Sequence, residues 1–248
     1  HVWHDVVVLQ RRLGKACQHI ELGHSRCRAL NADDLSGDLL AIRILGENST
    51  ESSRADFVNI RISGEETARN KKNTEVTLKD IYNVCDFSGL TNITNQEIAQ
   101  AEMLIEKEVL VGVISIKKQI DILHKKGYKI YYISDMYLPE TFLKEVLTEQ
   151  GFWKNGDKLY ISCISGKTKS KGDLFDFVAQ ENNINFKQWH HWGDNEQSDY
   201  KIPQKKGIHA HLIKHRFSNY EQQILKQDLF PGIYINQQLA GIQKATRL

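Results

Sequence analysis

Polar residues with phosphate-binding and metal-binding chemistry follow three apolar runs of the chain. Ser134 and Asp135 follow the first run, and Lys169 lies in the loop after the second. Asp194 and Asp199 follow the third run. A hydroxyl and backbone N–H groups at a helix start can hold phosphate oxygens, a lysine supplies a compact positive charge, and carboxylates suit a hard cation such as Mg²⁺. The pattern therefore indicates a site for a metal ion and a phosphoryl group.

The apolar runs are typical of β-strands that alternate with helices, because aromatic and β-branched residues dominate them. Such alternation predicts right-handed crossovers and a parallel sheet. In sheets of this kind, ligands bind outside the carboxyl ends of the strands. We therefore expect the three polar loops to meet at one pocket. The predicted strands span residues 128–133, 159–164, 189–192 and 208–213.

Each candidate residue also has a structural interpretation that needs no ligand. Ser134, at a strand end, is typical of a cap for the next helix. Asp135 and Asp194 fit as turn carboxylates, and Asp199 fits as a charge at a helix start. The lysines around Lys169 fit as a solvated loop. The combination of all three groups favours a ligand site over these separate interpretations.

Other reactive residue types are interpreted as structural. His190 and His191 alternate along a strand, so one should be buried and the other should face the opposite layer. The four cysteines have no Cys-x-x-Cys spacing, which favours reduced thiols in a cytoplasmic protein. The net charge of +2 gives no reason to expect nucleic-acid binding. No run of about 18 apolar residues predicts a membrane span.

Helical patterns precede the first predicted strand. Thr94 and Glu97 match a capping box, in which each side chain satisfies a free backbone N–H. Arg dominates the basic residues before residue 55 and Lys dominates after it, so the start of the chain is atypical, and both poor order and an aberrant sequence stay open for it. The predicted division is an N-terminal segment 1–55, a helical cap 56–126, an α/β core 127–215 and a helical C-terminal tail 216–248.

Three segments resemble the second, third and fourth motifs of the haloacid dehalogenase (HAD) superfamily. They are Ile133–Pro139, Gly166–Phe175 and Gly193–Asp199. More narrowly, they resemble a bacterial branch of hydrolases sometimes found beside or fused to surface-glycan glycosyltransferases. The resemblance implies an α/β fold: a Rossmann-like parallel sheet with helices on both faces, plus an inserted α-helical cap. It also implies Mg²⁺ as the cofactor.

The resemblance assigns a role to each matching residue. Ser134 would bind the phosphoryl group, with Asp135 beside it. Lys169 would neutralise the charges of the nucleophile and the phosphate. Asp194 would be the principal metal ligand, and Asp199 would support the metal directly or through water.

The superfamily also uses an Asp nucleophile in a first motif, Asp-x-Asp, at the end of an apolar strand. The nearest candidates here are Asp34 and Asp38, in a polar stretch that is more typical of a surface turn. The residues before them make a poor strand. If residues 1–55 are not the usual N-terminus of this family, the chain lacks its nucleophile and its first strand.

The leading hypothesis is a HAD-like, Mg²⁺-dependent phosphohydrolase that acts on a small phosphomonoester, such as a sugar phosphate, through an aspartyl-phosphate. The second is a non-catalytic HAD-like domain that binds a phospho-ligand or a partner, disabled by the missing first motif. A receiver-type signalling domain is the third, and the large helical segment before Ser134 argues against it. The expected partners are a small phosphorylated substrate and, by the resemblance, enzymes of glycan biosynthesis.

Overall fold

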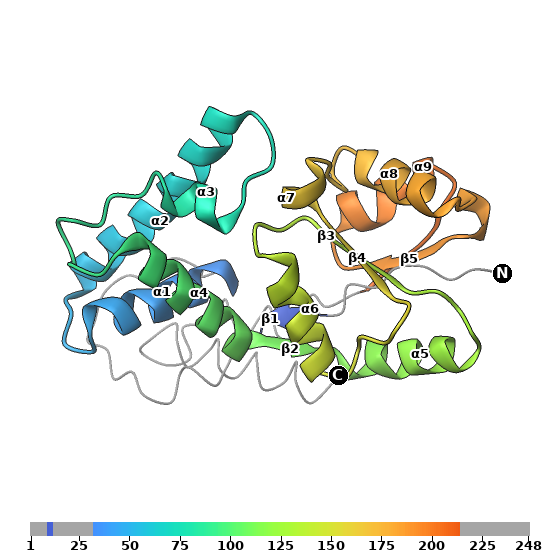
Figure 1. Ribbon diagram of the computed structural model, residues 1–248, viewed down its shortest axis with the longest axis horizontal. Coiled ribbons are helices and arrows are strands. Elements are labelled where there is room, and N and C mark those ends of the chain that lie inside the picture. Colours follow the sequence, from blue (N-terminus) through green and yellow to red (C-terminus); the bar gives the residue numbers. More distant parts are fainter. Residues whose placement is uncertain (1–8, 12–31, 214–248) are drawn as a thin grey trace, which may run out of the picture.

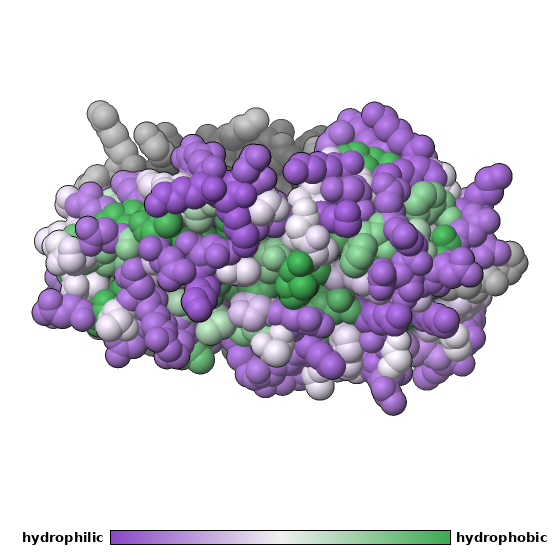
Figure 2. Space-filling view, turned by 45° about the horizontal axis from the view of Figure 1, so that its top comes forward, coloured by the Kyte–Doolittle hydropathy of each residue, from purple (hydrophilic) through white to green (hydrophobic). Residues whose placement is uncertain are grey.

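The computed structural model describes residues 9–11 and 32–213. Figure 1 shows two halves side by side, a helical half built from α1 to α4 and an α/β half that holds β3 to β6. Among the described helices, none is both long and apolar enough to cross a membrane. Most of the face in Figure 2 is hydrophilic, and apolar residues gather near its middle.

The α/β half contains two pairs of parallel strands. β3 (Tyr131–Ser134) pairs with β4 (Lys158–Ile161), and β5 (His190–Gly193) pairs with β6 (His209–Leu212). The α/β class and the parallel strands predicted from the sequence are confirmed. The helices of this half are α5 (Ile114–Lys125), α6 (Glu140–Glu149), α7 (Ser162–Ser165), α8 (Asp173–Asn182) and α9 (Ile202–Lys205).

Helices cover both faces of β3, because successive side chains of a strand point to opposite sides. Tyr131 and Ile133 pack with buried residues of α8. Tyr132 packs on the other side, with residues of α5 and α6. The alternation of large apolar side chains along the strand therefore fixes its position between two helical layers.

The helical half consists of α1 (Ala32–Leu45), α2 (Glu51–Lys72), α3 (Leu78–Tyr82) and α4 (Asn95–Val109). The predicted capping box at the start of α4 is confirmed: Thr94 accepts from the backbone N–H of Glu97, and the Glu97 side chain accepts from the N–H of Thr94. The buried residues of this half share one hydrophobic cluster with residues of α6 and of the loop before it, including Leu138, Phe142 and Leu143. The two halves are thus joined by a common core.

Some elements differ from the prediction. α2 spans the predicted boundary at residue 55, and the division into domains stays a prediction. The strand predicted at 159–164 ends at Ile161, because the chain turns into α7 and Gly166 then takes a left-handed conformation, φ 68°. β1 (Leu9–Arg11) pairs antiparallel with β2 (Leu110–Gly112). The predicted C-terminal tail and most of residues 1–31 lie outside the described residues.

A buried ion pair crosses the helical half. Arg61, on α2, donates to both carboxylate oxygens of Glu102, on α4, at 2.8 and 2.9 Å. The hydroxyl of Tyr82 donates to the same carboxylate at 2.5 Å. Burial alone would raise the pKa of Glu102, but the hydrogen bond and the charge of Arg61 lower it below its usual range. The pair is therefore ionised, and each partner depends on the other for compensation of its charge.

Loss of one partner of this pair should destabilise the protein strongly. Glu102→Ala removes the main counter-charge of the buried Arg61, with Glu65 remaining at 3.4 Å, and we expect a loss of about 3–5 kcal/mol in the free energy of unfolding. Urea denaturation measures this loss. Glu108→Ala is a matched control on the same helix, because Glu108 pairs with Arg43 at 3.0 Å on the exposed surface; it should cost less than about 1 kcal/mol. Equal losses in the two variants would contradict the importance of the buried pair.

Candidate functional site

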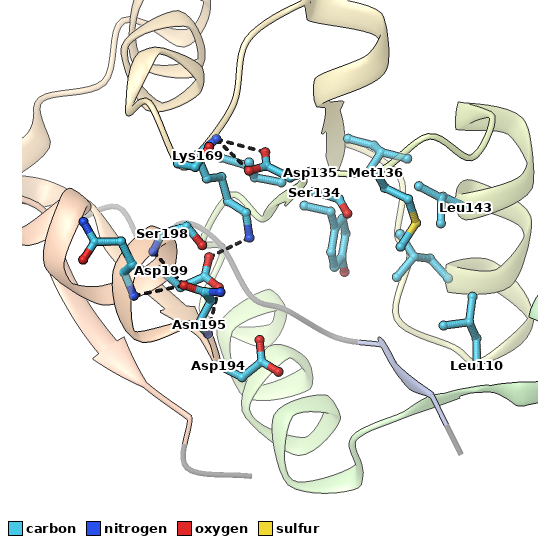
Figure 3. A pocket seen from close by; sticks show the side chains of 16 residues that line it. Leu110, Ser134, Asp135, Met136, Leu143, Lys169, Asp194, Asn195, Ser198 and Asp199 are labelled. Carbon is cyan, nitrogen blue, oxygen red and sulfur yellow. Dashed lines mark hydrogen bonds and ion pairs between the residues drawn. The ribbon is translucent and has the colours of Figure 1, made fainter. Parts of the chain in front are cut away.

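The five residues predicted for the site line one pocket, of about 520 Å³. Ser134 and Asp135 lie at the end of β3, Lys169 comes from the loop between α7 and α8, and Asp194 and Asp199 follow β5. Figure 3 shows the Lys169 side chain pointing toward Asp199, with Asp194 and Ser134 at the open part of the pocket. The carboxyl ends of the strands thus meet at a single place.

A buried ionic cluster forms one wall of the pocket. The Asp199 carboxylate is 1% exposed. Its Oδ1 accepts from the Lys169 amine at 2.6 Å and contacts Nε2 of His191 at 3.0 Å. Its Oδ2 accepts from the backbone N–H of Asn195 at 3.1 Å. Burial alone would raise the pKa of this carboxyl, but His191 and Lys169 together hold the pKa well below its usual range.

Gly193 makes room for this cluster at the end of β5. A Cβ atom built on Gly193 would lie 2.3 Å from Cγ of Asp199 and 2.7 Å from its Oδ2. No side chain can occupy that position without displacing the carboxylate. The glycine before Asp194 is therefore explained by the close approach of Asp199.

Asp135 orders the loop that carries Lys169. Both of its carboxylate oxygens accept from the backbone N–H of Lys169, at 2.9 and 3.1 Å. In the same loop, the backbone N–H of Thr168 donates to Asp173 at 2.8 Å. These bonds hold two adjacent amides in the middle of the loop, at the residue whose side chain enters the pocket.

Two groups in the pocket are available for a ligand. Among the described residues, neither the Ser134 hydroxyl nor the Asp194 carboxylate has a hydrogen-bond or ion-pair partner. Asp194 is exposed. Oxygen donors of this kind suit Mg²⁺, which keeps several waters and takes one or two carboxylates from the protein. The donor set therefore fits the cation, although the described residues contain no cluster of three or more His, Cys, Asp or Glu that could hold a metal alone.

Other candidates from the sequence lie elsewhere. Asp34 and Asp38 belong to α1, in the helical half, and the side chain of Asp38 does not line the pocket. Lys167 and Lys171 do not line it either, and the Lys167 amine lies over the ring of Phe177. Of the predicted carboxylates whose side chains the structure describes, those after β3 and β5 reach the pocket and Asp38 does not.

Some residues of the site were not predicted. His191 is the buried member of the histidine pair, as alternation along the strand indicated, but its contact with Asp199 was not anticipated. The signal was the carboxylate at 199: once buried, it needs charged or hydrogen-bonding partners. The pocket also has an apolar wall that was not predicted, lined by Leu110, Met136, Leu143, Leu147 and Leu159.

Comparison with known proteins gives the class of this fold. No family model matches the chain, and no curated protein matches it. Among solved structures, a HAD-family enzyme from Bacteroides thetaiotaomicron has a TM-score of 0.54 at 14% identity, over 90% of this chain and 96% of that one. A HAD-hydrolase from Bacillus subtilis, bound to magnesium, has a TM-score of 0.51 at 16% identity, over 84% and 85%. A HAD phosphatase from Thermococcus onnurineus has a TM-score of 0.51 at 12% identity, over 88% and 87%.

The protein is thus an α/β protein whose parallel strands end at a polar pocket beside a helical half. Its fold is similar to that of these HAD-family enzymes, in agreement with the resemblance of the three motifs around Ser134, Lys169 and Asp194. At these identities the likeness concerns the fold.

The buried carboxylate makes the stability depend on pH. Asp199→Asn removes the charge that Lys169 and His191 balance, and should cost about 3–5 kcal/mol at neutral pH. Because folding lowers the pKa of Asp199, its contribution is complete above the unfolded value of about 3.9 and is lost as the pH falls through the folded value. The difference between wild type and variant should therefore shrink below about pH 4. Urea denaturation from pH 3 to pH 7 measures it.

A variant of an exposed carboxylate is the control for this measurement. Asp176 pairs with Lys206 on the surface at 2.7 Å. Asp176→Asn should change the stability by less than about 1 kcal/mol. A difference for Asp199→Asn that stays constant from pH 7 to pH 3 would show that the charge of Asp199 does not carry the effect.

Gly193 offers a steric test of the same cluster. Gly193→Ala places a methyl group against the Asp199 carboxylate and should cost about 1–3 kcal/mol in the free energy of unfolding. Gly89→Ala is the control, since nothing lies within 4 Å of a Cβ atom at that position. Thermal unfolding of both variants measures the difference. Equal melting temperatures would contradict the close approach.

Proposed function

We propose that the protein is a Mg²⁺-dependent phosphohydrolase that acts on a small phosphomonoester. One observation carries the proposal: the Ser134 hydroxyl, the Lys169 amine and the Asp194 carboxylate line the same pocket. These are the three kinds of group that binding of a phosphoryl group with a bridging cation requires. The sequence resemblance suggests a sugar phosphate as the substrate and enzymes of glycan biosynthesis as partners.

Each residue has a defined part in this proposal. The Ser134 hydroxyl holds a phosphoryl oxygen. Lys169, oriented by Asp199, supplies positive charge to the transferred group. Asp194 holds Mg²⁺, which, when bound, supplies Lewis-acid stabilisation of charge on the phosphoryl oxygens. Two of the similar HAD-family proteins were crystallised with magnesium, which supports this choice of cation.

A second function, binding without turnover, follows from the state of the pocket carboxylates. Asp199 is bonded to Lys169 and His191. Asp135 is bonded to the backbone N–H of Lys169, in the loop between α7 and α8 (the lysine loop). Asp194 is the remaining pocket carboxylate and is assigned to the cation. Formation of an aspartyl-phosphate needs one more carboxylate, so a phospho-ligand-binding domain is the alternative to the phosphohydrolase.

Phosphate release tests the leading proposal. We expect Mg²⁺-dependent hydrolysis of para-nitrophenyl phosphate or of a sugar phosphate, abolished by a chelator. Asp194→Asn and Lys169→Ala should each lower kcat/KM by about 10²–10³, because each removes preorganised charge from the reacting group. Lys171→Ala is the matched control, since Lys171 lies in the same loop outside the pocket. Activity that is equal in all four proteins would reject the site.

Calorimetric titration with inorganic phosphate separates the two functions. Binding that needs Mg²⁺, with no release of phosphate from any substrate, would select the phospho-ligand-binding domain. Asp194 is exposed, so its variant should keep the wild-type stability while it loses affinity. Absence of phosphate binding in the wild type, with and without Mg²⁺, would reject both functions.

A further inference from the structure

A buried serine connects the loop after β3 to the helical half. Ser162, the first residue of α7, is fully buried. Its Oγ accepts from the backbone N–H of Met136 at 3.0 Å and donates to the Glu75 carboxylate at 2.9 Å. Met136 lies two residues after Ser134 and lines the pocket. Glu75 lies between α2 and α3. The serine therefore connects the loop after β3, residues 135–139 (the pocket loop), to the helical half.

The bonds of Ser162 have only one consistent direction. An ionised carboxylate accepts hydrogen bonds and cannot donate, so the single hydroxyl proton of Ser162 must point to Glu75. A lone pair of the same oxygen is then left for the N–H of Met136. The charge of Glu75 thereby orients the serine, and the serine positions the backbone at Met136.

Glu75 is itself fixed by an ionic chain along α2. Arg69 donates to Glu75 at 3.0 Å and to Glu65 at 3.0 and 3.1 Å. Glu65 also lies 3.4 Å from Arg61, the buried arginine that pairs with Glu102. The carboxylate that orients Ser162 is thus part of the helical half, held by the longest helix of that half.

The next residue of the pocket loop, Tyr137, is held by the helical half as well. Its carbonyl oxygen accepts from the backbone N–H of Leu78, the first residue of α3, at 2.8 Å. The Arg61 guanidinium lies over its ring, 5.0 Å from the ring centroid. Two successive residues of the loop therefore take their positions from the helical half.

We propose that Ser162 and Glu75 are positioning residues, which set the conformation of the loop after Ser134 and couple a ligand in the pocket to the helical half. The coupling to a ligand rests on the proposed function, with a phosphoryl group and Mg²⁺ as the ligand. The positioning of the loop by Ser162 and Glu75 does not need a ligand. Neither residue touches the reacting group; each acts through the backbone of Met136.

Hydrogen exchange at the Met136 amide tests the positioning role. In Ser162→Ala this N–H loses its acceptor, and its exchange should accelerate about tenfold, the effect of a hydrogen bond worth about 1.4 kcal/mol. The amides of β3 should exchange as in the wild type. Glu75→Gln, a milder change outside the buried helix start, should accelerate the same amide in the same direction.

Ser165→Ala is the matched control, because Ser165 lies in the same short helix and its hydroxyl bonds with Ile161 and Lys167, not with residues 134–137. It should leave the Met136 amide unchanged. A general loss of stability would accelerate the β3 amides together with Met136, and that result would overturn the positioning role. Unchanged exchange at Met136 in both Ser162→Ala and Glu75→Gln would also overturn it.

The coupling is tested with inorganic phosphate and Mg²⁺ as the probe. In the wild type, the probe should slow exchange in residues 134–137 and also in residues 75–80. In Ser162→Ala, the slowing at 75–80 should be lost and phosphate affinity should fall about tenfold. Equal slowing at 75–80 in both proteins would overturn the coupling. If phosphate fails to bind the wild type, the proposed function and the coupling fall together, and exchange without ligand still decides the positioning role.

Discussion

The carboxylate of Asp199 is the interaction on which the site depends. Buried charge is costly unless every lone pair is engaged, and here Lys169, His191 and a backbone N–H engage both oxygens. The lysine loop in turn is bound by Asp135 at the end of β3. A continuous set of polar bonds therefore runs from β3 to β5, between two strand pairs that share no ladder with each other among the described residues.

The same arrangement determines what the pocket can bind. Three carboxylates and one ammonium line it, which leaves a formal charge of −2 with His191 neutral. A phosphate dianion would be repelled from such a pocket, and a divalent cation would bring its charge to zero. Because Asp199 already compensates Lys169, Asp194 is the carboxylate that remains for the cation. Charge balance therefore favours a divalent cation in this pocket, in agreement with the Mg²⁺ that we propose.

The parallel strands and the meeting of the three loops were predictable, because aromatic and β-branched runs mark strands and strand ends in such sheets share one edge. The capping box at Thr94 was also predictable, because its two side chains lie three residues apart in the sequence. The end of β4 at Ile161 was not, since Ser162 leaves the strand for partners far away in the sequence, Met136 and Glu75. Contacts of this kind depend on tertiary packing, so the local sequence pattern does not predict them.

The helical half also contacts the loop that follows β3. Its buried pair of Arg61 and Glu102 would be replaceable by apolar residues if stability alone mattered, because such pairs are often no better than well-packed hydrophobic side chains. Arg61, however, also lies over the ring of Tyr137, a residue of the pocket loop. An apolar replacement would keep the packing of α2 against α4 and would lose the cation over that ring. The ionic chain in the helical half is therefore better explained by the conformation of the pocket loop than by the stability of the helices.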